Sequence, residues 1–157
     1  MHKSMGSGTL DQQKQQLIHQ YKSAPRKRIL IVNHEDDVNF ALKLVLEEEG
    51  TREVGSRNSF QVDSFNDPIL ALNNFEKGLY DLLLIAVVMP RLNGFELAKE
   101  IRKIDDKVKI CFLIAGEIPS KIQFDTLYGQ KEGYHDKFIK LPIENNDLVE
   151  EIDRIII

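Results

Sequence analysis

Short apolar runs alternate with stretches of helical period along the chain from Arg28 onward. Five runs rich in Val, Ile, Leu and Phe predict β-strands. They span Arg28–Val32, Phe60–Phe65, Asp81–Val87, Lys109–Ala115 and Lys137–Leu141. The first, third and fourth runs are nearly continuous in apolar character, which is typical of parallel strands that are covered on both faces.

Between the strands, apolar residues recur at the i, i+3, i+4 and i+7 spacing of helix faces. The faces are Val38, Ala41, Leu42, Val45 and Leu46; Pro68, Ala71, Leu72, Phe75 and Leu79; Leu97, Ala98, Ile101 and Ile104; and Val149, Ile152, Ile155 and Ile156. Gly50 is the expected C-terminal cap of the first helix. Asn66 and Asp67 are the candidate N-terminal caps of the second, and the third is expected to begin near Asn93-Gly94. A less regular stretch, Ile118–Leu127, predicts a fourth helix before the last one.

The alternation of five strands with five helices predicts one α/β domain with a doubly wound five-stranded parallel sheet and right-handed crossovers. In such sheets the ligand crevice lies at the carboxyl ends of the strands. Functional side chains are therefore sought after Val32, Ile85, Leu113 and Lys140.

The length of 157 residues favours a single folded domain, assigned to residues 27–157. Residues 1–26 are predicted to be a tail or a loosely docked helix. Leu10, Leu17, Ile18 and Tyr21 share one helical face, but this stripe is too sparse to fold alone. The tail is the favoured interpretation.

Charge divides unevenly along the chain. Residues 1–28 hold six Lys or Arg against one acid, a net +5, and residues 29–157 hold fifteen against twenty-four, a net −9. The acidic domain disfavours direct binding of nucleic acid, which needs basic patches. In the basic run Arg26-Lys27-Arg28, solvated charge before a buried strand is favoured over an anion site.

The single cysteine, Cys111, excludes an internal disulfide and a cysteine-based metal site. It lies in an apolar run and is expected to be buried. The sequence has neither an apolar stretch of about 20 residues nor the apolar core of a secretion signal, so a cytoplasmic location is expected.

Several of these segments resemble response-regulator receiver domains, over about residues 27–157. The resemblance is carried by Arg28–Glu35, by the block Asp81–Gly94 with its Met89-Pro90 pair, by Ile110–Ala115, and by Phe138–Pro142. It implies a flavodoxin-like (βα)5 fold and a place in two-component signalling, or phosphorelay. The family's bond corresponding to Leu141–Pro142 is cis, and the proline permits that isomer here.

Receiver domains take a phosphoryl group from a histidine kinase onto an aspartate, with Mg²⁺ held by acids and the phosphoryl oxygens contacted by a hydroxyl and a lysine. The resemblance places the acid pair at Asn33 and His34, the acceptor at Ala86, the hydroxyl at Ile114 and the lysine at Leu141. A methyl group cannot be phosphorylated. The resemblance therefore implies a degenerate pseudo-receiver with no cofactor or metal. An engineered acceptor knockout would not explain the replacements at Asn33, Ile114 and Leu141 as well.

Ionisable residues lie next to these positions. For the acidic cluster, a role at the start of a helix is favoured over metal binding, because anions complement the helix dipole there. The cluster is Glu35, Asp36 and Asp37. Lys140 lies one residue before the lysine position, and on a strand that slip turns a side chain to the other face. His34 is a titrating group at the crevice mouth, and an ordinary loop residue is favoured over a sensor of protons or ligands.

The expected crevice has one polar wall, Asn33 and His34, facing one apolar wall, Ala86, Ile114 and Leu141. Filling by its own side chains is favoured over a small apolar ligand. The sequence shows neither a nucleophile–base pair nor a phosphate-binding loop at the strand exits, so an enzyme is not expected.

The leading prediction is a phosphorylation-independent protein-interaction module. A homodimer through the face made by the fourth helix, fifth strand and fifth helix is one form of this prediction. Its switch and interface candidates are Phe138, Ile118, Ile122, Val149, Ile152, Ile155 and Ile156. The run Ile155-Ile156-Ile157 is expected to leave at least one side chain exposed. The alternative is a small-ligand or pH sensor that uses the crevice.

Overall fold

The computed structural model describes residues 9–15, 26–49, 60–117 and 137–156. Its strands are β1 (Lys27–Val32), β2 (Phe60–Phe65), β3 (Leu82–Ala86), β4 (Lys109–Ile114) and β5 (Lys137–Lys140). Its helices are α2 (Asp36–Glu49), α3 (Pro68–Asn74), α4 (Gly94–Ile104) and α6 (Asn145–Ile156). The predicted helix over Ile118–Leu127 lies outside the described residues.

The five strands form one parallel sheet in the order β2-β1-β3-β4-β5. The chain passes from β1 outward to β2, then returns across β1 to β3 and continues to β4 and β5. The order of the strands thus reverses between β1 and β3. This is the switch point at which doubly wound sheets form a crevice.

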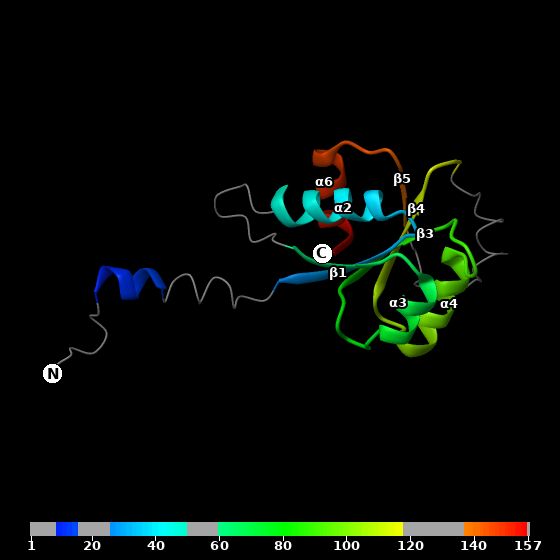
Figure 1. The fold of residues 1–157 in the computed structure, drawn as a ribbon, viewed down its shortest axis with the longest axis horizontal. Helices are drawn as coiled ribbons and strands as arrows, with labels where there is room; N and C mark the ends of the chain where they lie inside the picture. Colours follow the sequence, from blue (N-terminus) through cyan, green and yellow to red (C-terminus); the bar gives the residue numbers. More distant parts are fainter. Residues whose placement is uncertain (1–8, 16–25, 50–59, 118–136, 157) are drawn as a thin grey trace.

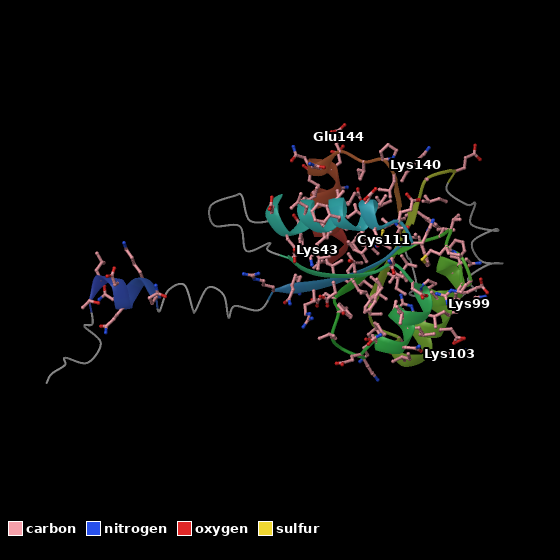
Figure 2. The ribbon with its side chains drawn as sticks, viewed as in Figure 1. Lys43, Lys99, Lys103, Cys111, Lys140 and Glu144 are labelled. Carbon is pink, nitrogen blue, oxygen red and sulfur yellow. The ribbon has the colours of Figure 1, made fainter. Side chains whose placement is uncertain are left out.

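Two layers of helices cover the sheet, with α2 and α6 on one face and α3 and α4 on the other (Figure 1). The strands alternate between the two layers, because successive side chains point to opposite faces. Ile29 and Ile31 pack beneath α2 and α6, whereas Leu30 and Val32 pack against the side of α3 and α4. Cys111 is fully buried within the sheet, as predicted (Figure 2).

Local sequence explains where α4 begins. The Asn93 side chain accepts a hydrogen bond from the Glu96 N–H, and the Glu96 carboxylate accepts one from the Asn93 N–H. This reciprocal capping box satisfies two N–H groups that the first turn leaves without helical partners. Asp67 caps α3 in a similar way by accepting from Ile69, and Pro68 occupies the first turn.

The helix predicted to reach Leu79 ends at Asn74, so that boundary was wrong. Phe75 has an extended backbone, and Gly78 turns the chain with φ +80°. Phe75 and Leu79 still pack against the core. Their apolar spacing therefore reflects contact with the core from a turn, which periodicity alone cannot distinguish from a further helical turn.

All five strand predictions agree with the structure to within one residue at each end, and β3 is one residue shorter than predicted at both ends. Asp81 precedes it, where the Asp81 carboxylate accepts a hydrogen bond of 2.8 Å from the Arg28 N–H. The Leu141–Pro142 peptide bond is cis. Residues 10–15 are helical, and the rest of the predicted helix to Tyr21 lies outside the described residues.

Polar side chains near the amino ends of β1 and β3 satisfy one another. The Tyr80 hydroxyl donates to the Asp63 carboxylate at 2.7 Å, and the Arg28 guanidinium lies 3.2 Å from the same oxygen and 5.7 Å from the centre of the Tyr80 ring. Arg28 is therefore half-buried and paired rather than fully solvated. Burial and the Asp63 hydrogen bond raise the pKa of Tyr80.

A buried carboxylate closes the same end of the sheet. Asp105 follows α4 and accepts hydrogen bonds from the backbone N–H groups of Gly78, Lys107 and Val108. Burial opposes ionisation, but these three donors outweigh it and hold the pKa of Asp105 below its usual value.

Within the part of the chain that the structure describes, no helix is long and apolar enough to cross a membrane.

Candidate functional site

A crevice of about 920 Å³ opens at the carboxyl ends of the strands, beside the switch point between β1 and β3. Its lining comes from four places: the β1–α2 turn with the inner side of α2, the exit of β3, the exit of β4, and the turn between β5 and α6. These are the strand exits that the sequence predicted. The crevice therefore contains all five positions at which the resemblance places receiver chemistry: Asn33, His34, Ala86, Ile114 and Leu141.

The apolar wall is formed by three neighbouring strands. Ala86 is the last residue of β3 and pairs in register with Leu113, and Ile114 is the last residue of β4 and pairs with Lys140. Ala86 is 8% exposed, while Ile114 and Leu141 are half-buried. The side chains of Ala86, Ile114 and Leu141 thus border the crevice with carbon atoms only.

Lys140 is exposed and does not line the crevice. Figure 2 shows it near the outer edge of the molecule, beside the segment that leads to Glu144. The next residue, Leu141, does line the crevice. The predicted one-residue slip is therefore confirmed: the cation beside the family's lysine position points to solvent.

The polar wall is held by the backbone. Asn33 is 5% exposed, and its N–H donates to the carbonyl of Phe65 at 3.1 Å. The Asn39 amide donates to the Asn33 carbonyl at 2.7 Å, which ties the turn after β1 to α2. His34 is exposed at the mouth, and its Nε2 lies 3.9 Å from the Glu35 carboxylate.

The acidic cluster splits between two roles. Asp36 and Asp37 occupy the first turn of α2, and the Asp36 carboxylate accepts a hydrogen bond from the Asn66 amide. Glu35 and Asp37 also line the crevice. Among the described lining residues these two are the acids and there is no Lys or Arg, so the described lining has a formal charge of −2.

The loop after β3 is fixed on both sides. Gly94 donates to the Val87 carbonyl at 2.9 Å, and a Cβ at position 94 would lie 2.3 Å from the Ala86 carbonyl oxygen. Only glycine permits this approach. On the outer side, Arg91 has φ 71° and forms an ion pair with the Asp67 carboxylate.

The contacts of Asp67 favour its ionised form. Desolvation opposes its ionisation, but the Ile69 N–H and the Arg91 guanidinium outweigh that cost, so its pKa is lowered. The loop that carries the wall of the crevice is thereby tied to the start of α3.

Among the switch and interface candidates, Phe138 is half-buried against two aromatic rings. Its centroid lies 5.6 Å from that of Phe112 and 6.4 Å from that of Phe95. Ile118 and Ile122 lie outside the described residues.

The α6 candidates differ in exposure. Ile152 is fully buried in the core beneath the helix, so its side chain cannot contact a partner, and that assignment was wrong. Val149 is half-buried, and Ile155 and Ile156 are partly buried against the same core. Both described members of the C-terminal isoleucine run are thus largely covered, and Ile157 lies outside the described residues.

Sequence reasoning missed the helical side of the crevice. Val38, Ala41 and Val45 of α2 continue the apolar wall well beyond the strand exits. The expectation that its own side chains fill the crevice was wrong for the described residues, which leave it open. The signal was present in the period of α2, but that period could not tell a helix face that borders a cavity from one that is fully packed.

Comparison with known proteins identifies the fold and the family. The model of the response regulator receiver domain matches residues 29–153. The response regulator receiver protein CpdR of Brucella abortus is 30% identical over 131 residues, which cover 83% of this chain and 98% of that protein. The transcriptional regulatory protein RprY of Bacteroides fragilis is 29% identical over 130 residues, which cover 83% of this chain and 50% of that protein.

Among solved structures, a chain in the crystal structure of histidine kinase ThkA in complex with response regulator protein TrrA is 28% identical with a TM-score of 0.63. The match covers 82% of this chain and 97% of that one. The chain spans about half the length of the first curated relatives that it matches. From the sheet order, the crevice and these matches together, the chain belongs to the response regulator receiver domain family.

Proposed function

We propose that this receiver domain is a phosphorylation-independent signalling module that accepts no phosphoryl group and catalyses no reaction. The observation that carries the proposal is Ala86. It ends β3 at the position of the family's acceptor, and its side chain is a single methyl group that borders the crevice. A phosphoryl acceptor needs a nucleophilic oxygen or nitrogen, and this side chain has neither.

The neighbouring positions support the same conclusion. Ile114 and Leu141 put hydrocarbon where a hydroxyl and a lysine would stabilise the charge of the phosphoryl group. The donor set also does not fit Mg²⁺, which demands oxygen ligands in near-octahedral geometry. Asn33 and His34 offer an amide and an imidazole, and Ala86 offers no donor.

The test is intact-mass spectrometry after incubation with acetyl phosphate and Mg²⁺. The wild-type chain is expected to keep its mass. The matched positive control is a variant that rebuilds the phosphorylation site on the same scaffold. It carries Asn33→Asp, His34→Asp, Ala86→Asp, Ile114→Thr and Leu141→Lys. A wild-type chain that gains one phosphoryl group would overturn the proposal.

The output of such a module is binding to protein. The partner of the similar regulator TrrA is a histidine kinase. A protein partner is likewise proposed here, and direct binding of nucleic acid is not, since residues 29–157 carry a net charge of −9. Homodimerisation through β5 and α6 is one form of this proposal, with Phe138, Val149, Ile155 and Ile156 as its described candidates.

Light scattering at several concentrations tests the homodimer, with and without beryllofluoride and Mg²⁺. Beryllofluoride mimics a phosphoryl group only where an aspartate can hold it. A concentration-dependent dimer that ignores the mimic is expected. A monomer at every concentration would remove the homodimer and leave a different protein as the partner.

A small-ligand sensor is the second candidate, and the open crevice of about 920 Å³ is the observation that favours it. Pockets for small molecules have volumes of roughly 300–1,000 Å³ and mostly apolar linings with a few polar groups. In this candidate a ligand would take the place of phosphorylation as the signal.

A further inference from the structure

We infer that the crevice binds an apolar small molecule, and that it prefers one whose polar end is neutral or cationic over one whose polar end is anionic. The inference deepens the ligand-sensor candidate and rests on the proposed loss of the acceptor, because a carboxylate at position 86 would charge the apolar wall. Three features of the lining carry it: its volume, its two-sided chemistry and its charge.

The lining can desolvate a ligand of substantial size. Apolar side chains reach it from α2, from the exits of β3 and β4, and from the β5–α6 turn. They include Val38, Ala41, Leu42, Val45, Ala86, Leu113, Ile114, Leu141, Ile143 and Leu148. Burying the apolar surface of a ligand among them yields roughly 25 cal/mol per Å².

The polar groups lie on one side, so a bound molecule would have a defined orientation. Asn33, His34, Glu35 and Asp37 belong to the β1–α2 turn and the first turn of α2. The apolar part of α2 extends away from them through Ala41 to Val45. The polar end of a ligand would face the turn, and its apolar body would lie along the helix.

Charge decides which polar end is accepted. Glu35 and Asp37 are the charged members of the described lining, which contains no Lys or Arg. Lys140 is exposed and is not among the described lining residues. The two acids would repel a carboxylate or phosphate on the ligand and attract an ammonium group.

The test uses Nile red, a neutral apolar dye whose fluorescence rises when it is desolvated, titrated with the full chain. One saturable site is expected. Three competitors with the same alkyl chain, dodecylamine, dodecanol and dodecanoate, are then compared below their aggregation concentrations. The protonated amine is expected to displace the dye at a concentration about fivefold lower than the carboxylate, since two exposed acids act on it.

Two filling variants locate the site. Ala41 and Ala115 are both exposed and both line the crevice, on opposite sides, so Ala41→Trp and Ala115→Trp should fill it without disturbing the core. Each is expected to weaken Nile red binding by about tenfold or more. Leu44→Trp is the matched control, because Leu44 is an exposed residue of α2 that does not line the crevice.

A third variant separates charge from volume. Glu35→Gln with Asp37→Asn should abolish the preference for dodecylamine over dodecanoate. Three results would each overturn the inference. They are no saturable dye binding, equal dye binding by the filled and control variants, and equal displacement of the dye by dodecanoate and dodecylamine. Phosphoryl uptake in the mass experiment would instead overturn the proposed function, so the two failures are distinguishable.

Discussion

The two ends of the parallel sheet place polar and apolar side chains in opposite ways. Near the amino ends of β1 and β3, Arg28, Asp63 and Tyr80 satisfy one another in a half-buried network. At the carboxyl ends, where parallel sheets hold their functional groups, Ala86 and Ile114 border an open crevice.

The difference separates two uses of polar groups in one fold. At the amino end the hydrogen bonds and the ion pair of Arg28, Asp63 and Tyr80 join residues of the chain to each other, so they contribute to stability. At the carboxyl end the polar groups lie to one side of an apolar cavity and leave room for another molecule. Substitutions at the amino end should therefore change the free energy of unfolding, whereas most of those in the crevice lining should change binding instead.

The largest expected effect is an exception at the carboxyl end. Gly94→Ala should destabilise the fold by about 3 kcal/mol, because the added Cβ would meet the Ala86 carbonyl oxygen and force the backbone apart. Urea unfolding measures it. Gly116→Ala is the control, since a Cβ there meets nothing within 4 Å. Equal unfolding midpoints for the two variants would show that Gly94 does not fix the loop.

Asp105→Ala removes the buried carboxylate at the amino end of the sheet. It should lower the free energy of unfolding by about 2 kcal/mol, because the Gly78 and Val108 N–H groups lose their acceptor. The matched control is Asp106→Ala at the exposed neighbour, which should stay within about 0.5 kcal/mol of wild type.

The same carboxylate sets a pH dependence. The folded pKa of Asp105 is lowered, so its stabilisation is present above the unfolded pKa of about 4 and is lost as pH falls through the folded value. The stability gap between wild type and Asp105→Ala should therefore shrink in acid. A gap that stays constant below pH ~4 would contradict the ionised, hydrogen-bonded state.

Tyr80→Phe should lower the free energy of unfolding by about 1 kcal/mol, because one hydrogen bond to Asp63 disappears while the ring remains. The raised folded pKa of Tyr80 means that its contribution is complete below the unfolded pKa of about 10 and is lost as pH rises through the folded value. Unfolding at neutral and alkaline pH measures both. A Phe variant as stable as wild type at neutral pH would contradict this account of the network.

The smallest effect concerns the loop beside the crevice. Arg91 adopts a left-handed conformation that costs residues with a Cβ about 1 kcal/mol. Both Arg91→Gly and Arg91→Ala remove the ion pair to Asp67, so the Gly variant should be the more stable by about that amount. If the Ala variant unfolds at the same urea concentration, the loop must relax out of the left-handed region.

The sheet and three of the described helices could be predicted because their signals are local. The strands are apolar runs, and the start of α4 is indicated by the capping box at Asn93. The end of α3 could not be predicted, since Phe75 and Leu79 stay apolar for contact with the core after the helix has ended.

Two features of the sites depend on contacts that no local pattern records. The Arg28–Asp63 pair joins residues 35 positions apart in different strands. The size of the crevice depends on how α2, the strand exits and the β5–α6 turn pack together. The sequence located the crevice residues at the strand exits but not those on α2, and it gave no means to decide whether their side chains fill the space between them.

The most direct test of the account is the ¹H–¹⁵N spectrum of the full chain, recorded before and after addition of beryllofluoride and Mg²⁺. The account predicts no change in the amide signals of Asn33, Ala86 and Ile114, because the crevice offers the mimic no carboxylate at its acceptor position. Saturable shifts confined to those amides would contradict it and show that the crevice still binds the phosphoryl group.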